Sequence, residues 1–327
     1  MPDIEANVPD AEEPFRHTTI WSGNIPLHVV ESGLALGASN AATLQSEEEV
    51  NGELILFLHG FPECWYSWRH IMRQLDTRYR VVAADCRGYN LSGKPINVEH
   101  YSMRYSFDDI RAIMAHYRVQ KMTLVGHDWG GMAAWYFAAR FPEHVAHLVT
   151  INAPHPNCFQ TALDHDAVQR AASQYINRFR APECEARLLA AGLEQFWQNL
   201  FGEAQQKGLF SNADKAIYLA AWAQPGALTG MLNWYRAAPF VVPAPDAAMD
   251  ISHALSEQLK VSVPTLVIWG MKDNILLPTL LAELDAYVDN LTIHRVADGG
   301  HGLIHEMPIT VAALIGQFID KPVGGSN

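Results

Sequence analysis

The sequence predicts an α/β fold in which a mostly parallel sheet is flanked by helices and interrupted by an all-helical insertion. Short apolar runs without polar alternation recur along the chain, as expected for parallel strands that are covered on both faces. Amphipathic stretches separate these runs, and strands that alternate with helices favour a parallel sheet. The strand pattern is absent from residues 156–259, where helical patterns replace it, and it resumes afterwards.

The N-terminal part of the chain predicts a hairpin between an acidic arm and a polar loop. Residues 1–14 are acidic and contain several prolines, and we expect a flexible arm there. Residues 17–32 have the pattern of two short strands joined by a turn at residues 22–24. Residues 33–52 are small and polar, which predicts an inserted surface loop.

The remaining elements follow from the two periodicities. Buried strands are predicted within residues 53–60, 79–88, 121–128, 144–154 and 264–270, and another precedes residue 297. Helices are predicted within residues 101–119, 132–145, 165–179, 183–201, 212–224 and 227–239. We therefore assign residues 1–155 and 260–327 to a sheet domain, and residues 156–259 to a helical lid. Open α/β sheets bind ligands beyond the carboxyl ends of their strands, where this lid is expected.

Composition excludes several classes of function. The 327 residues carry a formal net charge of −12 without a basic cluster, so nucleic acid and anionic membranes are poor partners. Neither a secretory signal nor an apolar run of roughly 20 residues is present. The 4 cysteines lack CxxC spacing and are interpreted as reduced thiols. We expect a cytoplasmic protein, and both a monomer and a homodimer remain open.

Neither a cofactor nor a metal ion is predicted. Residues 88–94 spell GxxxxGK, but Pro95 stands where a phosphate-binding loop needs Ser or Thr. The chain has no HExxH motif and no Cys/His quartet. The insertion is rich in aromatic residues, which helix packing explains and which can also line an apolar pocket. They include Phe196, Trp197, Trp222 and Trp234.

The segment GHDWGG, residues 126–131, raises the central question of function. A strand leads into this turn and a helix follows, so the turn has the outline of GxSxG with Asp128 in place of serine. Asp128 could be a helix cap, because aspartate favours helix N-termini. It could also be a nucleophile that the turn presents above the sheet edge.

Two downstream residues favour the nucleophile. Asp273 follows a buried strand, and His301 follows another strand in a glycine-rich loop. The order nucleophile, acid, histidine is that of α/β-hydrolases. His305 is a second candidate base, but the GGH context favours His301.

The segment HGFP, residues 59–62, predicts an anion-binding turn near the same site. The backbone N–H groups of Phe61 and Trp129 would form an oxyanion hole, whereas the alternative is an ordinary turn. We expect the substrate pocket to be bordered by His59, Pro62, Trp129 and Trp234.

Taken together, these motifs resemble the soluble epoxide hydrolases of the α/β-hydrolase fold. The resemblance extends from about Phe15 through the lid. It rests on HGFPE (59–63), DCRGYNLSGKP (85–95), GHDWGG (126–131), NWYR (233–236), KDNILLP (272–278) and GGH (299–301). It implies that Asp128 is the nucleophile, His301 the general base and Asp273 the acid that orients the base.

The family also uses two lid tyrosines that donate hydrogen bonds to the epoxide oxygen. Tyr235 in NWYR matches one of them, and Tyr175 is the better match for the other. Three further tyrosines remain as weaker alternatives, namely Tyr101, Tyr105 and Tyr218.

The resemblance implies that a small apolar epoxide and water react to give a vicinal diol. A carboxylate can open an epoxide and is then regenerated, because the resulting ester can be hydrolysed. Serine would instead form an inert ether. The same nucleophile serves haloalkane and haloacid dehalogenases, which are the alternative. Haloalkane dehalogenases usually have Asn or Trp where Phe61 stands, and fluoroacetate dehalogenases have Arg in place of Trp129. A scaffold that only binds a ligand is a third possibility, which the complete set of Asp128, Asp273 and His301 disfavours.

Overall fold

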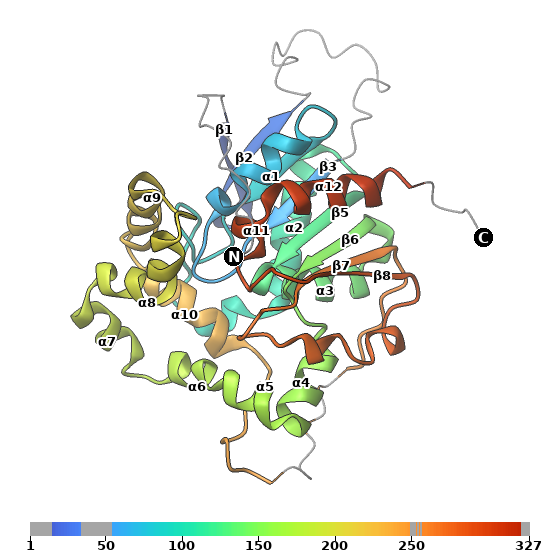
Figure 1. The fold of residues 1–327 in the computed structure, drawn as a ribbon. Coiled ribbons are helices and arrows are strands. Elements are labelled where there is room, and N and C mark those ends of the chain that lie inside the picture. The colour runs from blue at the N-terminus through green and yellow to red at the C-terminus, as the bar shows by residue number, and fades with distance from the viewer. Residues whose placement is uncertain (1–14, 34–53, 249–252, 254, 256, 322–327) are drawn as a thin grey trace.

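The computed structural model describes residues 15–33, 54–248, 253, 255 and 257–321 (Figure 1). The predicted flexible arm at residues 1–14 and the predicted loop after Gly33 therefore lie outside the described residues. Within the described ranges the chain forms a twisted sheet with helices on both faces.

The sheet has eight strands in the order β1-β2-β4-β3-β5-β6-β7-β8. The hairpin of β1 (Arg16–Ser22) and β2 (Ile25–Gly33) is antiparallel and joins β4 in antiparallel register. All other neighbours are parallel, which confirms the predicted mostly parallel sheet. These strands are β3 (Leu54–Leu58), β4 (Arg80–Ala84), β5 (Met122–His127), β6 (Val145–Ile151), β7 (Thr265–Gly270) and β8 (Leu291–Val296).

Strand burial follows position in the sheet. Every residue of β3, β5 and β7 is buried, which explains their continuous apolar sequences. The strand before His301 was predicted to be buried in the same way, and this was wrong. β8 is an edge strand in which only Val296 is fully buried, because it has a single neighbour and helices do not cover both of its faces.

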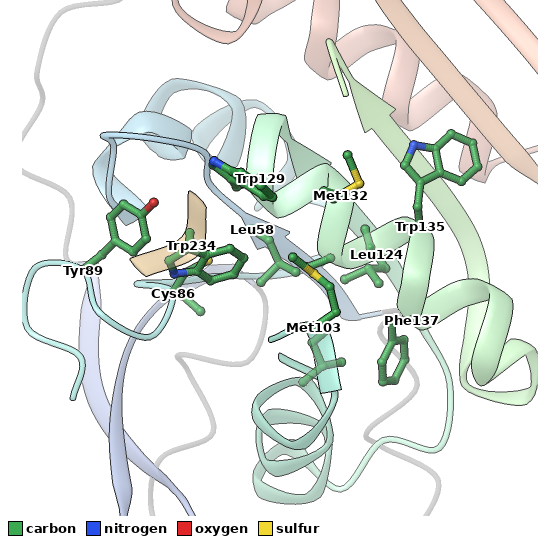
Figure 2. Packing of buried hydrophobic residues seen from close by; sticks show 14 of the residues in the cluster. Leu58, Cys86, Tyr89, Met103, Leu124, Trp129, Met132, Trp135, Phe137 and Trp234 are labelled. Atoms are coloured by element: carbon green, nitrogen blue, oxygen red, sulfur yellow. The ribbon is translucent and has the colours of Figure 1, made fainter. Parts of the chain in front are cut away.

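Two apolar clusters cover the two faces of the sheet. Alternate residues of β3 enter different clusters, since successive side chains of a strand point to opposite faces. One face packs against α2 (Met103–Tyr117) and α3 (Asp128–Arg140), and Figure 2 shows part of this packing. The other face packs against α1 (Arg69–Leu75) and α12 (Pro308–Ile319). Shorter helices are η2 (Trp65–Trp68), η3 (Val98–Tyr101), η4 (Pro142–His144), η5 (Pro278–Leu281), η6 (Leu284–Ala286) and α11 (Leu303–Glu306).

Between β6 and β7 the chain forms a run of helices, residues 156–237, which we call the helical segment. These helices are α4 (Pro156–His165), α5 (Ala167–Ala172), α6 (Gln174–Arg180), α7 (Cys184–Ala191), α8 (Leu193–Gln206), α9 (Asn212–Trp222) and α10 (Ala227–Ala237). They gather to one side of the sheet (Figure 1). Two helices predicted as continuous are broken, at Ser173 and at Gly192, where Gly192 takes a φ of 86° that suits glycine. The separate domain boundaries remain a prediction.

Aromatic side chains form the interior of the helical segment. The Trp197 and Trp222 ring centroids are 5.9 Å apart, and Phe196 lies 5.0 Å from Trp222. Trp234 instead packs beside Trp129, with their centroids 6.0 Å apart. The described helices include none that is both long and apolar enough to span a bilayer.

Candidate active site

Asp128 lies at the sharp turn between β5 and α3. Its φ is 49°, in the left-handed region that a non-glycine residue adopts only when its surroundings hold it there. A Cβ on Gly130 would lie 2.1 Å from the Leu58 carbonyl oxygen, so only glycine allows this close approach. His127 occupies the N-cap position of α3, which argues against Asp128 as the cap.

The three residues predicted as a catalytic set are brought together. His301 Nδ1 lies 2.8 Å from Asp273 Oδ2. On the other side of the ring, His301 Nε2 lies 3.9 Å from Asp128 Oδ2. The Asp273 side chain is fully buried, whereas those of Asp128 and His301 are 12% and 19% exposed. A small gap therefore separates the imidazole from the Asp128 carboxylate, and solvent reaches both.

Asp273 is held by several donors besides His301. Its Oδ1 accepts hydrogen bonds from the backbone N–H groups of Ile275 and Leu276, both at 2.9 Å. Asn152 Nδ2 donates to Oδ2 at 2.7 Å. Burial alone would raise the pKa of Asp273, but the charge of His301 and these hydrogen bonds hold it below its ordinary value. The carboxylate is therefore ionised and fixed in orientation.

Asn152 is a site residue that the sequence analysis missed. It follows β6 directly, with a φ of 42°, and its Oδ1 accepts a hydrogen bond from the Gly270 N–H at 3.2 Å. Its position at the carboxyl end of a strand next to β7 was the available signal, because such positions cluster at one sheet edge.

The charge state of His301 depends on the carboxylates around it. Burial would lower its pKa, but the charge and hydrogen bond of Asp273, with further contributions from Asp128 and Glu63, raise the pKa to about 9. In the resting protein His301 is therefore an imidazolium at neutral pH.

The HGFP turn supplies a backbone hydrogen-bond donor to the Asp128 carboxylate. The Phe61 N–H donates a hydrogen bond to Asp128 Oδ1 at 2.8 Å. Gly60 permits this contact, because a Cβ there would lie 2.4 Å from Asp128 Cβ. The second predicted donor, the backbone N–H of Trp129, remains a prediction.

Two tyrosines of the helical segment face each other near Asp128. The ring centroids of Tyr175, on α6, and Tyr235, on α10, are 6.0 Å apart. Burial raises the pKa of both phenols well above the ordinary value, and the charge of Asp128 raises both further. A hydrogen bond from the Trp129 side chain acts in the opposite direction on Tyr235. Both phenols are neutral donors at physiological pH.

The weaker tyrosine candidates have partners elsewhere. The Tyr101 hydroxyl donates to the Pro95 carbonyl at 2.8 Å. The Tyr105 hydroxyl accepts from Arg104 at 2.8 Å. The Tyr218 hydroxyl shares a hydrogen bond with Ser67 Oγ at 2.9 Å. These contacts favour the pair of Tyr175 and Tyr235.

His305 is directed away from Asp128 and into a buried cluster with Glu63. Its Nε2 lies 2.5 Å from Glu63 Oε1, and Glu63 Oε2 lies 3.3 Å from His127 Nδ1. The other nitrogen of His127 contacts the backbone carbonyl of His301 at 2.9 Å. Burial would raise the pKa of Glu63, but the two histidines hold it well below the ordinary value. The cluster supports the backbone of His301, a role that the sequence analysis did not assign.

The residues expected to border the pocket have backbone partners. His59 donates from Nδ1 to the Gly60 carbonyl at 2.8 Å and accepts the Cys86 N–H on Nε2 at 3.0 Å. Burial lowers the pKa of His59, so its ring is neutral. The Trp234 indole donates to the Arg87 carbonyl at 2.9 Å, and its ring lies near Tyr89 and Cys86 in Figure 2. Pro62 is buried. The composition of the substrate pocket remains a prediction.

The described part of the chain contains no group of three or more His, Cys, Asp or Glu side chains arranged to hold a metal ion. The predicted site residues supply a carboxylate, an imidazole, two phenols and a backbone donor.

The chain is similar to several known proteins. The sequence matches the α/β hydrolase fold family over residues 53–308. An AB hydrolase superfamily protein of Bacillus subtilis is 36% identical over 271 residues, covering 82% of this chain and 91% of that protein. Epoxide hydrolase 4 of Mus musculus is 34% identical over 277 residues, covering 82% of this chain and 73% of that protein.

Solved structures show the same similarity. The crystal structure of an epoxide hydrolase from Bacillus megaterium in complex with an inhibitor has a TM-score of 0.80 and 30% identity, covering 94% of this chain and 100% of that chain. An epoxide hydrolase from a metagenome of a hot environment has a TM-score of 0.81 and 34% identity, covering 95% and 100% of the two chains. The chain belongs to the epoxide hydrolase family of α/β-hydrolase-fold enzymes.

Proposed function

We propose that this enzyme hydrolyses an epoxide to a vicinal diol through an ester on Asp128. The observation that carries this proposal is the pair of neutral phenols, Tyr175 and Tyr235, whose rings lie 6.0 Å apart beside the Asp128 carboxylate. An epoxide oxygen needs a donor as it becomes an alkoxide, and a neutral phenol supplies one. The family members named epoxide hydrolase support the same reaction.

In the first step Asp128 Oδ2 attacks a ring carbon of the epoxide. The carbon–oxygen ring bond breaks, and its electron pair remains on the oxygen, which receives a proton from Tyr175 or Tyr235. Asp128 Oδ1 is assigned to the carbonyl of the new ester, because it already accepts the Phe61 N–H at 2.8 Å. The phenolate regains its proton from solvent.

In the second step water hydrolyses the ester. Formation of the ester removes the negative charge of Asp128, so the pKa of His301 falls and the imidazole can lose its proton. Neutral His301 then takes a proton from water as the water oxygen attacks Asp128 Cγ. The Phe61 N–H, with the predicted Trp129 N–H, stabilises the negative charge on Oδ1. The tetrahedral intermediate then collapses, and the bond between Asp128 Cγ and the diol oxygen breaks. The diol oxygen takes the proton from His301, while Asp273 keeps the imidazole oriented.

The apolar surroundings support a small apolar substrate. Phe61 lies against Tyr235 with their ring centroids 5.0 Å apart, and Phe179 lies 5.0 Å from each of these rings. Water is the second substrate.

The predicted cytoplasmic location belongs to the same proposal, and the four buried free cysteines support it.

Dehalogenation is the alternative reaction of the same nucleophile. A leaving halide needs donors such as an indole N–H. Trp129 lies beside Tyr235, with their ring centroids 5.1 Å apart, but the HGFP turn carries Phe61 where haloalkane dehalogenases usually have Asn or Trp. A panel of terminal epoxides, internal epoxides and haloalkanes distinguishes the two reactions by diol and halide release. Halide release without diol formation would reject the epoxide proposal.

Replacement of Asp128 and His301 tests the two steps separately. Asp128→Ala should abolish diol formation, because it removes the carboxylate that is proposed to form the ester, and unchanged turnover would exclude Asp128 as nucleophile. His301→Gln should form the ester without hydrolysing it, so intact-protein mass spectrometry after styrene oxide should show a stable adduct. An adduct-free His301→Gln protein would contradict the two-step scheme.

A further inference from the structure

Arg180 ends α6 and reaches the end of α10, the helix that carries Tyr235. Its Nε donates to the Tyr235 carbonyl at 2.8 Å. Its two terminal nitrogens donate to the carbonyls of Phe240 at 2.9 Å and Ala238 at 3.1 Å. One guanidinium therefore binds three carbonyl groups at and just beyond the C-terminus of α10.

These contacts stabilise the helical turn that holds Tyr235. The last four carbonyls of a helix have no partner within it, and a positive charge at this end interacts favourably with the helix dipole. The Tyr235 carbonyl also accepts a hydrogen bond from the Ala238 N–H, at a long 3.4 Å. Burial lowers the pKa of Arg180, but arginine remains protonated in proteins. Without Arg180 this turn would lose its best hydrogen bond and its charge partner.

The same residue belongs to the helix that carries the other phenol. Tyr175 lies on α6 together with Arg180. Phe179, next to Arg180, has its ring 5.8 Å from that of Tyr175 and 5.0 Å from that of Tyr235. Arg180 thus connects the two helices whose tyrosines must meet one epoxide oxygen.

We propose that Arg180 is a positioning residue that fixes the separation of the Tyr175 and Tyr235 hydroxyls and thereby controls the ring-opening step. This inference rests on the proposed function. Ring opening uses both phenols, whereas hydrolysis of the Asp128 ester uses His301 and the oxyanion donors. Loss of Arg180 therefore slows ester formation and leaves ester hydrolysis nearly unchanged. A general loss of structure would slow both steps.

The test is Arg180→Met, which keeps much of the side-chain length and removes every donor. Single-turnover experiments with styrene oxide, stopped by acid and read by intact-protein mass spectrometry, give the rate constants of ester formation and ester hydrolysis. Ester formation should fall by between about 10-fold and 100-fold, the effect of a displacement near 1 Å at a reacting group. Ester hydrolysis should change by less than about twofold. Arg180→Lys keeps the charge and one donor position, and should recover part of the ester-formation rate.

Arg170 provides a matched control in the same helical segment. It is fully buried and donates to the carbonyls of Leu163 at 2.8 Å and Ala247 at 2.7 Å, but none of its recorded contacts reaches α10. Arg170→Met should lower the melting temperature and leave ester formation within about twofold of the wild type. If either methionine variant fails to fold, the lysine variants at the same positions are compared.

Two results would overturn the positioning role. One is an equal decrease of both rate constants in the Arg180 variants. The other is an equal loss of ester formation in the Arg170 and Arg180 variants. Failure of the proposed function has a different signature, because the wild-type protein would then form neither ester nor diol with any epoxide of the panel.

Discussion

At the scale of single residues, Asp128 is one of three carboxylates that raise the pKa of His301, after Asp273 and together with Glu63. His301 Nε2 lies 3.9 Å from Asp128 Oδ2, and His301 Nδ1, on the other side of the imidazole, lies 2.8 Å from Asp273 Oδ2. With both carboxylates ionised, the pKa of His301 is raised to about 9 despite burial. In the proposed mechanism, conversion of Asp128 to a neutral ester removes one of these charges, so the pKa of His301 falls after the nucleophile has reacted.

This coupling predicts the effect of neutral variants on His301. Asp128→Asn should lower the pKa of His301 below the wild-type value of about 9, because it removes a charge that favours the imidazolium. Asp273→Asn should lower it further, since Asp273 acts on His301 more strongly than Asp128 does. NMR titration of the imidazole resonances measures both values. A pKa that is unchanged in Asp128→Asn would contradict the coupling.

At the scale of elements, α9 attaches the helical segment to the HGFP turn and to η2 and α1, which follow this turn. Arg69 donates to Asp214 at 2.8 Å, and the Tyr66 hydroxyl donates to the same carboxylate oxygen at 2.9 Å. The Trp222 indole donates to the Pro62 carbonyl at 2.6 Å. Asp214 also completes a capping box with Ser211 at the start of α9. One carboxylate therefore serves both the helix terminus and the contact with the sheet domain.

Removal of this carboxylate should strongly destabilise the protein. Asp214→Ala leaves the buried Arg69 without its charge partner, which typically costs about 3–5 kcal/mol of the free energy of unfolding. Chemical denaturation measures this loss. The control is Glu203→Gln, because the pair of Glu203 and Lys207 is exposed and contributes little to the free energy of unfolding. Similar losses in the two variants would show that the contact does not join the helical segment to the sheet domain.

At the scale of the whole molecule, all 4 cysteines are buried and free. Burial raises the pKa of each thiol, so the reactive thiolate is disfavoured in the folded protein. Disulfides therefore do not contribute to the stability of this fold.

The thiols should consequently report on global unfolding. A thiol-specific reagent should label none of the 4 cysteines quickly in the native protein and all of them in denaturant. The melting temperature should be the same with and without a reductant. Rapid labelling of the native protein, or a lower melting temperature in reductant, would contradict this picture.

The sequence by itself determined that strands and helices alternate around a mostly parallel sheet, and it predicted the principal site residues. Buried parallel strands need continuous apolar runs, and the turn after β5 needs glycine at Gly130, so both leave signals in the local sequence. Asp128, Asp273 and His301 could be recognised because each follows a predicted strand, and the carboxyl ends of parallel strands meet at one sheet edge.

Only the tertiary structure decided which of several similar residues meet. The sequence offered both His301 and His305 as candidate bases and could not show which partners they contact. The fold turns His305 towards Glu63 and His301 towards Asp273. It also joined Asn152 to Asp273, and it placed Arg180 on the end of α10. These contacts connect residues far apart in the sequence, and the pairing of strands and the packing of helices set them. Local periodicity reports which face of an element is buried, but not which partner it will meet.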